Sequence, residues 1–394
     1  MPIATRVGRA HVPTKSLLRR AFDAVSDLTV GAEEELLLLD PGTLAPAAAS
    51  EWLLAGLGDS RMHRPELWSA QVELVTDVGD SPAAVVADLR AARMRLVEAA
   101  AGRLRIAGLG THPLALPAQT FSPGDRYAEI VEQHRLGARL GALASGLHVH
   151  VAVQGADRAL AVYNAVRGYA PLFTALAANA PFIAGEDSGL ATVRPMLADG
   201  LPRQGVGPHL PTWSDLEELV RWGRRTGAIP DPAKLWWECR LNLRLGTVEL
   251  RAPDAQSSLD DDHALIALTH ALVADLCERL DGGERLPAHD TLRIQENRWR
   301  AMRFGMKAEL IDLESDRPVH ARDAVAGLLD RVARHAPPAG LAHVRSLAAR
   351  DEPRAQRRVA RLHGPAAIVA RAADSAETEL GMATVPDGHL RAHG

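Results

Sequence analysis

The sequence predicts an α+β fold in which helices pack on one face of an antiparallel or mixed β-sheet. Two patterns support this fold class. Short segments alternate between apolar and polar residues with a period of two, which is typical of strands with one buried face. Longer segments between them carry apolar residues at helical spacing. No internal repeat or long low-complexity linker interrupts this succession, which favours a single domain.

Five segments are predicted to be strands, at residues 29–40, 70–77, 105–111, 146–153 and 246–252. In the first segment, Glu33 and Glu35 share one face, and Glu34 points to the other face together with apolar residues. In the fourth segment, His148 and His150 share a face. The apolar face of the predicted sheet is expected to pack against helices, and the opposite face carries carboxylates, imidazoles and arginines.

The predicted helices cover residues 82–101, 157–178, 215–223, 259–280 and 292–305. Ser81 followed by Pro82 is typical of an N-cap and a first helical position, and Gly102 is a suitable stop. We expect residues 1–28 to form an N-terminal extension, residues 29–372 a catalytic domain and residues 373–394 a flexible C-terminal tail. The first two dozen residues and this tail are the segments most expected to be disordered.

Composition limits the class of protein. The net charge of -4 is small for 394 residues, which argues against a nucleic-acid or membrane-surface protein. Cys239 and Cys277 are the only cysteines, so a disulfide framework is excluded. No secretory signal and no apolar run of roughly 18 residues is found. We therefore expect a cytoplasmic protein with no membrane or nucleic-acid partner; homo-oligomerisation stays open.

Several predicted strand residues are of the types that bind metal ions and phosphates. Glu33 and Glu35 would lie about 7 Å apart on one face, where a divalent cation such as Mg²⁺ would relieve their repulsion. Glu73 lies between apolar residues in the second strand, where a lone carboxylate needs a partner. Each residue also has an ordinary interpretation, namely a solvated acidic strand end for the first pair and a salt bridge for Glu73.

The last two strands extend this set. His148 and His150 have a spacing found in zinc sites, serve equally as donors to phosphate, and also fit two hydrogen-bonded structural histidines. Glu249 and Arg251 share a strand face, where Glu could hold a metal and Arg could grip phosphate oxygens; a cross-strand ion pair is the alternative. No P-loop, no Rossmann fingerprint and no GxSxG motif is present. Any bound ATP must therefore be held by metals and scattered arginines.

Taken in order, these segments resemble the bacterial carboxylate–amine ligases known as type-2 glutamate–cysteine ligases. The resemblance starts at 29–36 with the pattern G-x-E-x-E and spans roughly residues 29–305. The other matching stretches are 72–77, 110–113, 148–151, Arg194-Pro195, 246–251 and 296–301. Residues 236–240 also fit the family's tryptophan, acid and arginine. The Gly- and Pro-rich residues 196–208 match no pattern and are expected to form a loop over the site.

The resemblance implies a fold related to the catalytic domain of glutamine synthetase, with a curved, mostly antiparallel sheet that holds ATP and two or three Mg²⁺ ions on its concave face. The implied metal ligands are Glu33, Glu35, Glu73 and Glu249, with His148 close to the metals or phosphates. Arg251 and Arg194 would be the cations on the phosphate side, so the implied nucleotide-binding set is His148, Glu249, Arg251 and Arg194. His150 is a candidate general base.

The implied activity is ATP-dependent joining of a carboxylate to an amine through an acyl phosphate. Glutamate and cysteine are the default small-molecule substrates, and another amino acid or a natural-product acid and amine is the alternative. A metal-dependent hydrolase or phosphotransferase could use the same carboxylate face. A protein that only binds would be expected to have lost one of the carboxylates or Arg251, and all are present.

Overall fold

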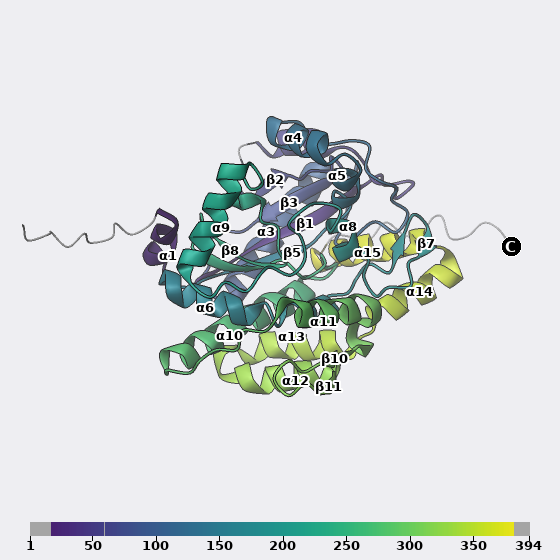
Figure 1. Cartoon of the computed structure of the whole chain (residues 1–394). Coiled ribbons are helices and arrows are strands. Elements are labelled where there is room, and N and C mark those ends of the chain that lie inside the picture. Colours follow the sequence, from purple (N-terminus) through teal and green to yellow (C-terminus); the bar gives the residue numbers. More distant parts are fainter. Residues whose placement is uncertain (1–16, 59, 382–394) are drawn as a thin grey trace, which may run out of the picture.

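The computed structural model describes residues 17–58 and 60–381 as an α+β fold built around a seven-stranded antiparallel sheet (Figure 1). The strand order is β2-β3-β1-β5-β9-β8, and β4 pairs with the end of β1. The strands are β1 (Val30–Leu39), β2 (His63–Pro65), β3 (Gln71–Val75), β4 (Arg105–Ala107), β5 (Leu147–Ala152), β8 (Cys239–Asn242) and β9 (Thr247–Leu250). The predicted fold class is confirmed.

One face of this sheet, here called the helix face, is covered by three long helices. They are α3 (Pro82–Ala100), α6 (Ala156–Val166) and α10 (Leu259–Asp281). Alternation along β1 sends Val30, Ala32, Leu36 and Leu38 into this layer, where each is at most 2% exposed. Behind α10 lie α12 (Ala321–Val332) and α13 (Pro338–Ala349), which Figure 1 shows as a further layer below the sheet.

The opposite face, here called the cavity face, is covered only in part. Leu37 and Leu39, at the end of β1, are fully buried in a second apolar cluster, whereas Glu33 and Glu35 lie where the face opens. Further helices surround this opening: α4 (Asp125–His134), α5 (Leu136–Gly141), α8 (Arg194–Ala198) and α9 (Trp213–Thr226). Other elements are α2 (Ser50–Leu57), β6 (Phe182–Ile183), β7 (Glu186–Asp187), η2 (Pro232–Lys234), α11 (Thr291–Phe304), η3 (Gly305–Lys307), β10 (Glu309–Ile311), β11 (Pro318–His320), η4 (Ala333–His335) and α14 (Glu352–His363).

The five predicted strands are confirmed, but the prediction of one helix over residues 157–178 is wrong. The chain forms α6 and a separate α7 (Ala170–Leu176), with Gly168 between them. Pro171 lies in the first turn of α7, where its missing N–H costs nothing. In a continuous helix its ring would clash with the carbonyl of residue 167, so the helix must restart. The helix predicted at 215–223 is longer and runs from Trp213 to Thr226.

Two described stretches near the chain ends form helices that the sequence did not predict. Residues 17–24 form η1 (Leu17–Arg19) and α1 (Arg20–Ala24), and Phe22 is fully buried with its ring 5.4 Å from that of Trp213. Residues 373–379 belong to α15 (Ala366–Glu379). The prediction of disorder is therefore wrong for these two stretches, and residues 1–16 and 382–394 lie outside the described residues. Within the described ranges no helix is long and apolar enough to span a membrane.

Candidate active site

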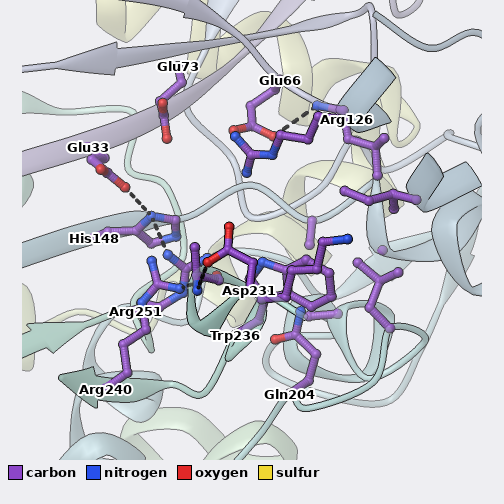
Figure 2. Close-up of a pocket in the computed structure, with 18 of the residues that line it drawn as sticks. Glu33, Glu66, Glu73, Arg126, His148, Gln204, Asp231, Trp236, Arg240 and Arg251 are labelled. Carbon is purple, nitrogen blue, oxygen red and sulfur yellow. Dashed lines mark hydrogen bonds and ion pairs between the residues drawn. The ribbon is translucent and has the colours of Figure 1, made fainter. Parts of the chain in front are cut away.

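A cavity of about 1060 Å³ lies over the open part of the cavity face (Figure 2). Its floor is made by the sheet, which contributes Glu33, Glu35, Glu73, His148 and Arg251. Its walls come from β2, α4, α8, α11, β8 and the segment before β8. Besides acidic and apolar residues, these walls contribute cationic and aromatic residues, among them Arg64, Arg126, Tyr127, Arg194, Lys234, Trp236, Arg240 and Arg298.

Strand register brings residues that are far apart in sequence into one cluster. Glu33 lies opposite His148, and Glu35 lies opposite Glu73. His150 in turn lies opposite Glu249. Directly opposite residues in an antiparallel pair point to the same face, so these side chains meet above the sheet. The predicted set of Glu33, Glu35, Glu73, Glu249, His148, His150 and Arg251 is therefore brought together by the fold.

Glu33 lies between the two histidines. Its Oε2 is 3.2 Å from His148 Nδ1, and its Oε1 is 3.5 Å from His150 Nε2. Burial alone would raise the pKa of Glu33, but its contacts with His148 and His150 outweigh burial and lower it below the ordinary value. Burial, together with nearby Arg251, lowers the pKa of His148 to about 3. Burial opposes charge on His150 too, but the Glu249 and Glu33 carboxylates prevail and raise its pKa.

Glu35 and Glu73 form the other half of the cluster and have too few cationic partners. Glu35 accepts a hydrogen bond of 2.6 Å from the Gly146 backbone N–H, yet burial and the neighbouring Glu66 carboxylate raise its pKa to about 8. The pKa of Glu73 is raised well above its ordinary value by burial and by Glu66, Glu33 and Glu35. Carboxylates held this close favour a shared proton or a bound cation.

Glu249 differs from the other carboxylates because cations and an amide already surround it. Arg240 donates to both of its oxygens, at 2.7 and 2.9 Å, and Asn242 donates at 2.9 Å. Arg251 Nη1 lies 2.6 Å from Glu249 Oε1 and 3.3 Å from His148 Nδ1. Burial would raise the pKa of Glu249, but Arg240, His150 and Arg251 hold it well below the ordinary value.

Arg194 has a different set of contacts from the one the sequence suggested. Its guanidinium donates to the backbone carbonyls of Arg251, at 3.0 Å, and Ala252, at 3.3 Å. It also packs on Gly146, where a Cβ would lie 2.2 Å from Arg194 Nη2, so only glycine leaves room for it. Arg194 lines the cavity, but its hydrogen bonds hold the backbone that carries Arg251 in place.

Several residues at the cavity were not singled out from the sequence. Glu66 follows β2, a strand of three residues that is too short to be recognised by alternation. In Figure 2 the Glu66 side chain points into the same space as that of Glu73. Arg240 lies on β8, where the match of residues 236–240 to the family pattern was the available signal. Arg298 comes from α11 and pairs with Glu238 at 2.7 Å.

The donor set fits a divalent metal. Among the described residues, two groups offer ligand atoms within 4.8 Å of one another: Glu33, His148 and Glu249, and Glu35, Glu73 and His148. Carboxylate oxygens with one imidazole suit Mg²⁺ or Mn²⁺ better than a structural zinc. The surplus negative charge around Glu35 and Glu73 gives a cation a physical reason to bind there.

Comparison with known proteins identifies the family. The model of glutamate–cysteine ligase family 2 (GCS2) matches residues 29–350. The chain belongs to this family. A relative from Rubrobacter xylanophilus named "Putative glutamate--cysteine ligase 2-3" is 38% identical over 319 residues, covering 79% of this chain and 85% of the relative. A "Putative glutamate--cysteine ligase 2-1" from Mycolicibacterium smegmatis is 33% identical over 355 residues, covering 89% and 92%.

Two solved structures share the fold of this GCS2 member. A bifunctional glutathione synthetase from Pasteurella multocida superposes with a TM-score of 0.66 at 13% identity, covering 89% of this chain and 52% of that protein. A glutamate–cysteine ligase from Francisella tularensis in complex with AMP gives 0.63 at 13% identity, covering 90% and 93%. The predicted similarity to glutamate–cysteine ligase in fold is confirmed.

Proposed function

We propose that this protein is an ATP-dependent carboxylate–amine ligase, with L-glutamate and L-cysteine as the first substrates to test. The observation that supports this most is the cluster of four carboxylates and two histidines on one sheet face, opening into a cavity rimmed by arginines. The names of the GCS2 relatives and the AMP bound to the Francisella enzyme agree with it. We expect the protein to act in the cytoplasm, where thiols stay reduced, in agreement with its two buried free cysteines.

The chemistry consists of two displacements. A carboxylate oxygen of the acid attacks the γ-phosphorus of ATP, so an O–P bond forms, the β–γ bridge bond breaks and ADP leaves. The nitrogen of the amine then attacks the acyl carbon of this acyl phosphate. A C–N bond forms, inorganic phosphate leaves, and the nitrogen loses a proton. Both steps concentrate negative charge on phosphoryl oxygens, so neutralising that charge is the main requirement placed on the protein.

Each residue at the site has a proposed part in this chemistry. Glu33, Glu35, Glu73, Glu249 and His148 would hold two or three Mg²⁺ ions, which when bound neutralise phosphate charge. Arg251 would contact the transferred phosphoryl group. Arg194 would keep the Arg251 backbone in position, because its guanidinium is bonded to the Arg251 carbonyl. His150 is a proposed acceptor for the proton of the amine.

The test is ADP release by the purified full-length protein with ATP and Mg²⁺, with amino acids supplied singly and in pairs. We expect release to require an acid together with an amine, and mass spectrometry to find the dehydrated conjugate. Release that needs glutamate and cysteine would establish that pair. Release without any amine would instead indicate a hydrolase or phosphotransferase and contradict the ligase proposal.

A further inference from the structure

The hydrogen bonds of Glu249 are complete, and this limits how it could bind a metal. An ionised carboxylate has about four lone-pair positions. At Glu249, Oε1 accepts from Arg240 and Arg251, and Oε2 accepts from Arg240 and Asn242. The side chain is fully buried, so no further oxygen surface is open to a ligand. A metal ion can therefore reach Glu249 only if one of these donors leaves.

The donors are held with very different strength. Arg240 uses all three of its nitrogens: Nε and Nη2 bind Glu249, and Nη1 binds the carbonyls of Ala233 and Leu235, each at 3.0 Å. Arg251 is bound through Nη1 alone, which contacts Glu249 Oε1 and His148 Nδ1. In the described part of the chain its Nε and Nη2 make no hydrogen bond. Of the two arginines, Arg251 is therefore the one that exchanges more easily, and Arg240 is a fixed clamp.

Arg251 also contacts two residues that could hold a metal ion. Glu249 and His148 belong, with Glu33, to one of the two groups whose ligand atoms lie within 4.8 Å of one another. Figure 2 shows Glu33, His148 and Arg251 connected by interactions, and all three belong to the floor of the cavity. The guanidinium nitrogen thus contacts two of the three members of a metal-binding group.

We propose that Arg251 and a divalent cation compete for Glu249 and His148, so that cation binding at the Glu33, His148 and Glu249 group releases the Arg251 guanidinium into the cavity. This inference rests on the proposed function, which supplies both the metal ion and the ATP phosphates that the released guanidinium would contact. It adds a coupling that the proposed function does not contain: the metal that binds the phosphates also frees the arginine that contacts them. Arg240 keeps Glu249 in place throughout the exchange.

The experiment is a Mn²⁺ titration of the full-length protein, without ATP or substrates, in which electron paramagnetic resonance measures free Mn²⁺. Arg251→Ala removes the competitor, and Arg240→Ala is the matched control because it removes an arginine bound to the same carboxylate. We expect Arg251→Ala to lower the dissociation constant of one Mn²⁺ about tenfold, the strength of a charge-assisted hydrogen bond. We expect Arg240→Ala to leave that constant unchanged or to raise it, because Arg251 still competes and Glu249 loses its clamp.

Each outcome decides the matter. Equal affinity in wild type and Arg251→Ala would overturn the competition. Equal tightening in both variants would also overturn it, because the loss of any nearby positive charge would then explain the effect. If circular dichroism shows that Arg251→Ala does not fold, Arg251→Met gives the same comparison, because Met keeps the aliphatic part of the side chain but has no hydrogen-bond donor. If the wild-type protein releases ADP but the variants bind Mn²⁺ as tightly as wild type, only the competition is rejected. If the wild-type protein binds no Mn²⁺, the metal assignment is rejected as well.

Discussion

Glu33, Glu34 and Glu35 are consecutive in β1, yet they belong to two regions with opposite electrostatic character. Glu34 points to the helix face, where Arg93 of α3 binds both of its oxygens and also lies 2.6 Å from Asp262 of α10. Glu33 and Glu35 point to the cavity face, where histidines and other carboxylates are their main neighbours. Glu34 and Glu35 are both at most 9% exposed, so burial does not separate the two roles.

The difference lies in how the buried charge is compensated. On the helix face, Arg93 pairs directly with both Glu34 and Asp262, and the cluster joins β1 to α3 and α10. On the cavity face, Glu35 and Glu73 form no ion pair with an arginine among the described residues, and burial and neighbouring carboxylates raise the pKa of both. A buried carboxylate with a complete set of internal partners supports the fold, whereas one without such partners is available for a ligand.

Removal of Arg93 should have the largest effect on stability. Arg93→Ala leaves Glu34 and Asp262 fully buried without their cation, which should cost about 3–5 kcal/mol of unfolding free energy. Chemical denaturation measures this loss. Arg95→Ala, on an exposed position of the same helix, is the control and should change stability by about 0.5 kcal/mol or less. Equal losses in both variants would show that the helix-face cluster has no special role.

Glu33→Gln on the cavity face should reduce activity, whereas a matching change on the helix face should reduce stability. Glu33→Gln keeps the size of the side chain but removes a charge from the metal-binding group, so we expect ADP formation to fall about 10²–10³-fold. The thermal unfolding midpoint should stay close to that of wild type. Glu34→Gln should do the reverse, with lower stability and near wild-type activity of the folded fraction. Near wild-type turnover of Glu33→Gln at low Mg²⁺ would remove Glu33 from the site.

Gly146→Ala tests the packing beneath the cavity face. The new Cβ would lie 2.2 Å from Arg194 Nη2, so the guanidinium must move away from the carbonyls of Arg251 and Ala252. We expect a loss of about 1–3 kcal/mol in unfolding free energy. Gly56→Ala is the control, because no atom lies within 4 Å of its Cβ position in α2, and it should stabilise by about 0.5–1 kcal/mol.

The last prediction concerns pH and the helix face. Burial and Glu34 raise the pKa of Asp262 well above its usual 3.8, because one arginine cannot neutralise two buried carboxylates. The folded state then binds more protons than the unfolded state, so stability falls as pH rises from 3.8 through the raised pKa, by up to about 1.4 kcal/mol per pH unit. Asp262→Asn should flatten this dependence in denaturation curves measured at increasing pH above 3.8. Parallel curves for both proteins would contradict a protonated Asp262.

Much of the site could be predicted because its pattern is local. Alternation in residues 29–40 assigned Glu33 and Glu35 to one face and Glu34 to the other, and the structure confirms both. Arg240 was harder to predict as a site residue because β8 has only four residues, and its contact with Glu249 depends on pairing with β9. Arg298 lies in the matching stretch 296–301, but a helix sequence does not reveal which neighbours its faces will meet.

The sequence by itself determined which side chains share a face, because side-chain direction in a strand follows from backbone geometry alone. It also determined the start of α3, where Ser81 accepts a hydrogen bond from the Ala84 N–H. Only the tertiary structure decided which strands are neighbours, and hence that Glu33 meets His148 and Glu35 meets Glu73. It also decided that Arg240 clamps Glu249 while Arg251 is held by one nitrogen. These features depend on register and on loops packed from distant parts of the chain, and no local pattern encodes them.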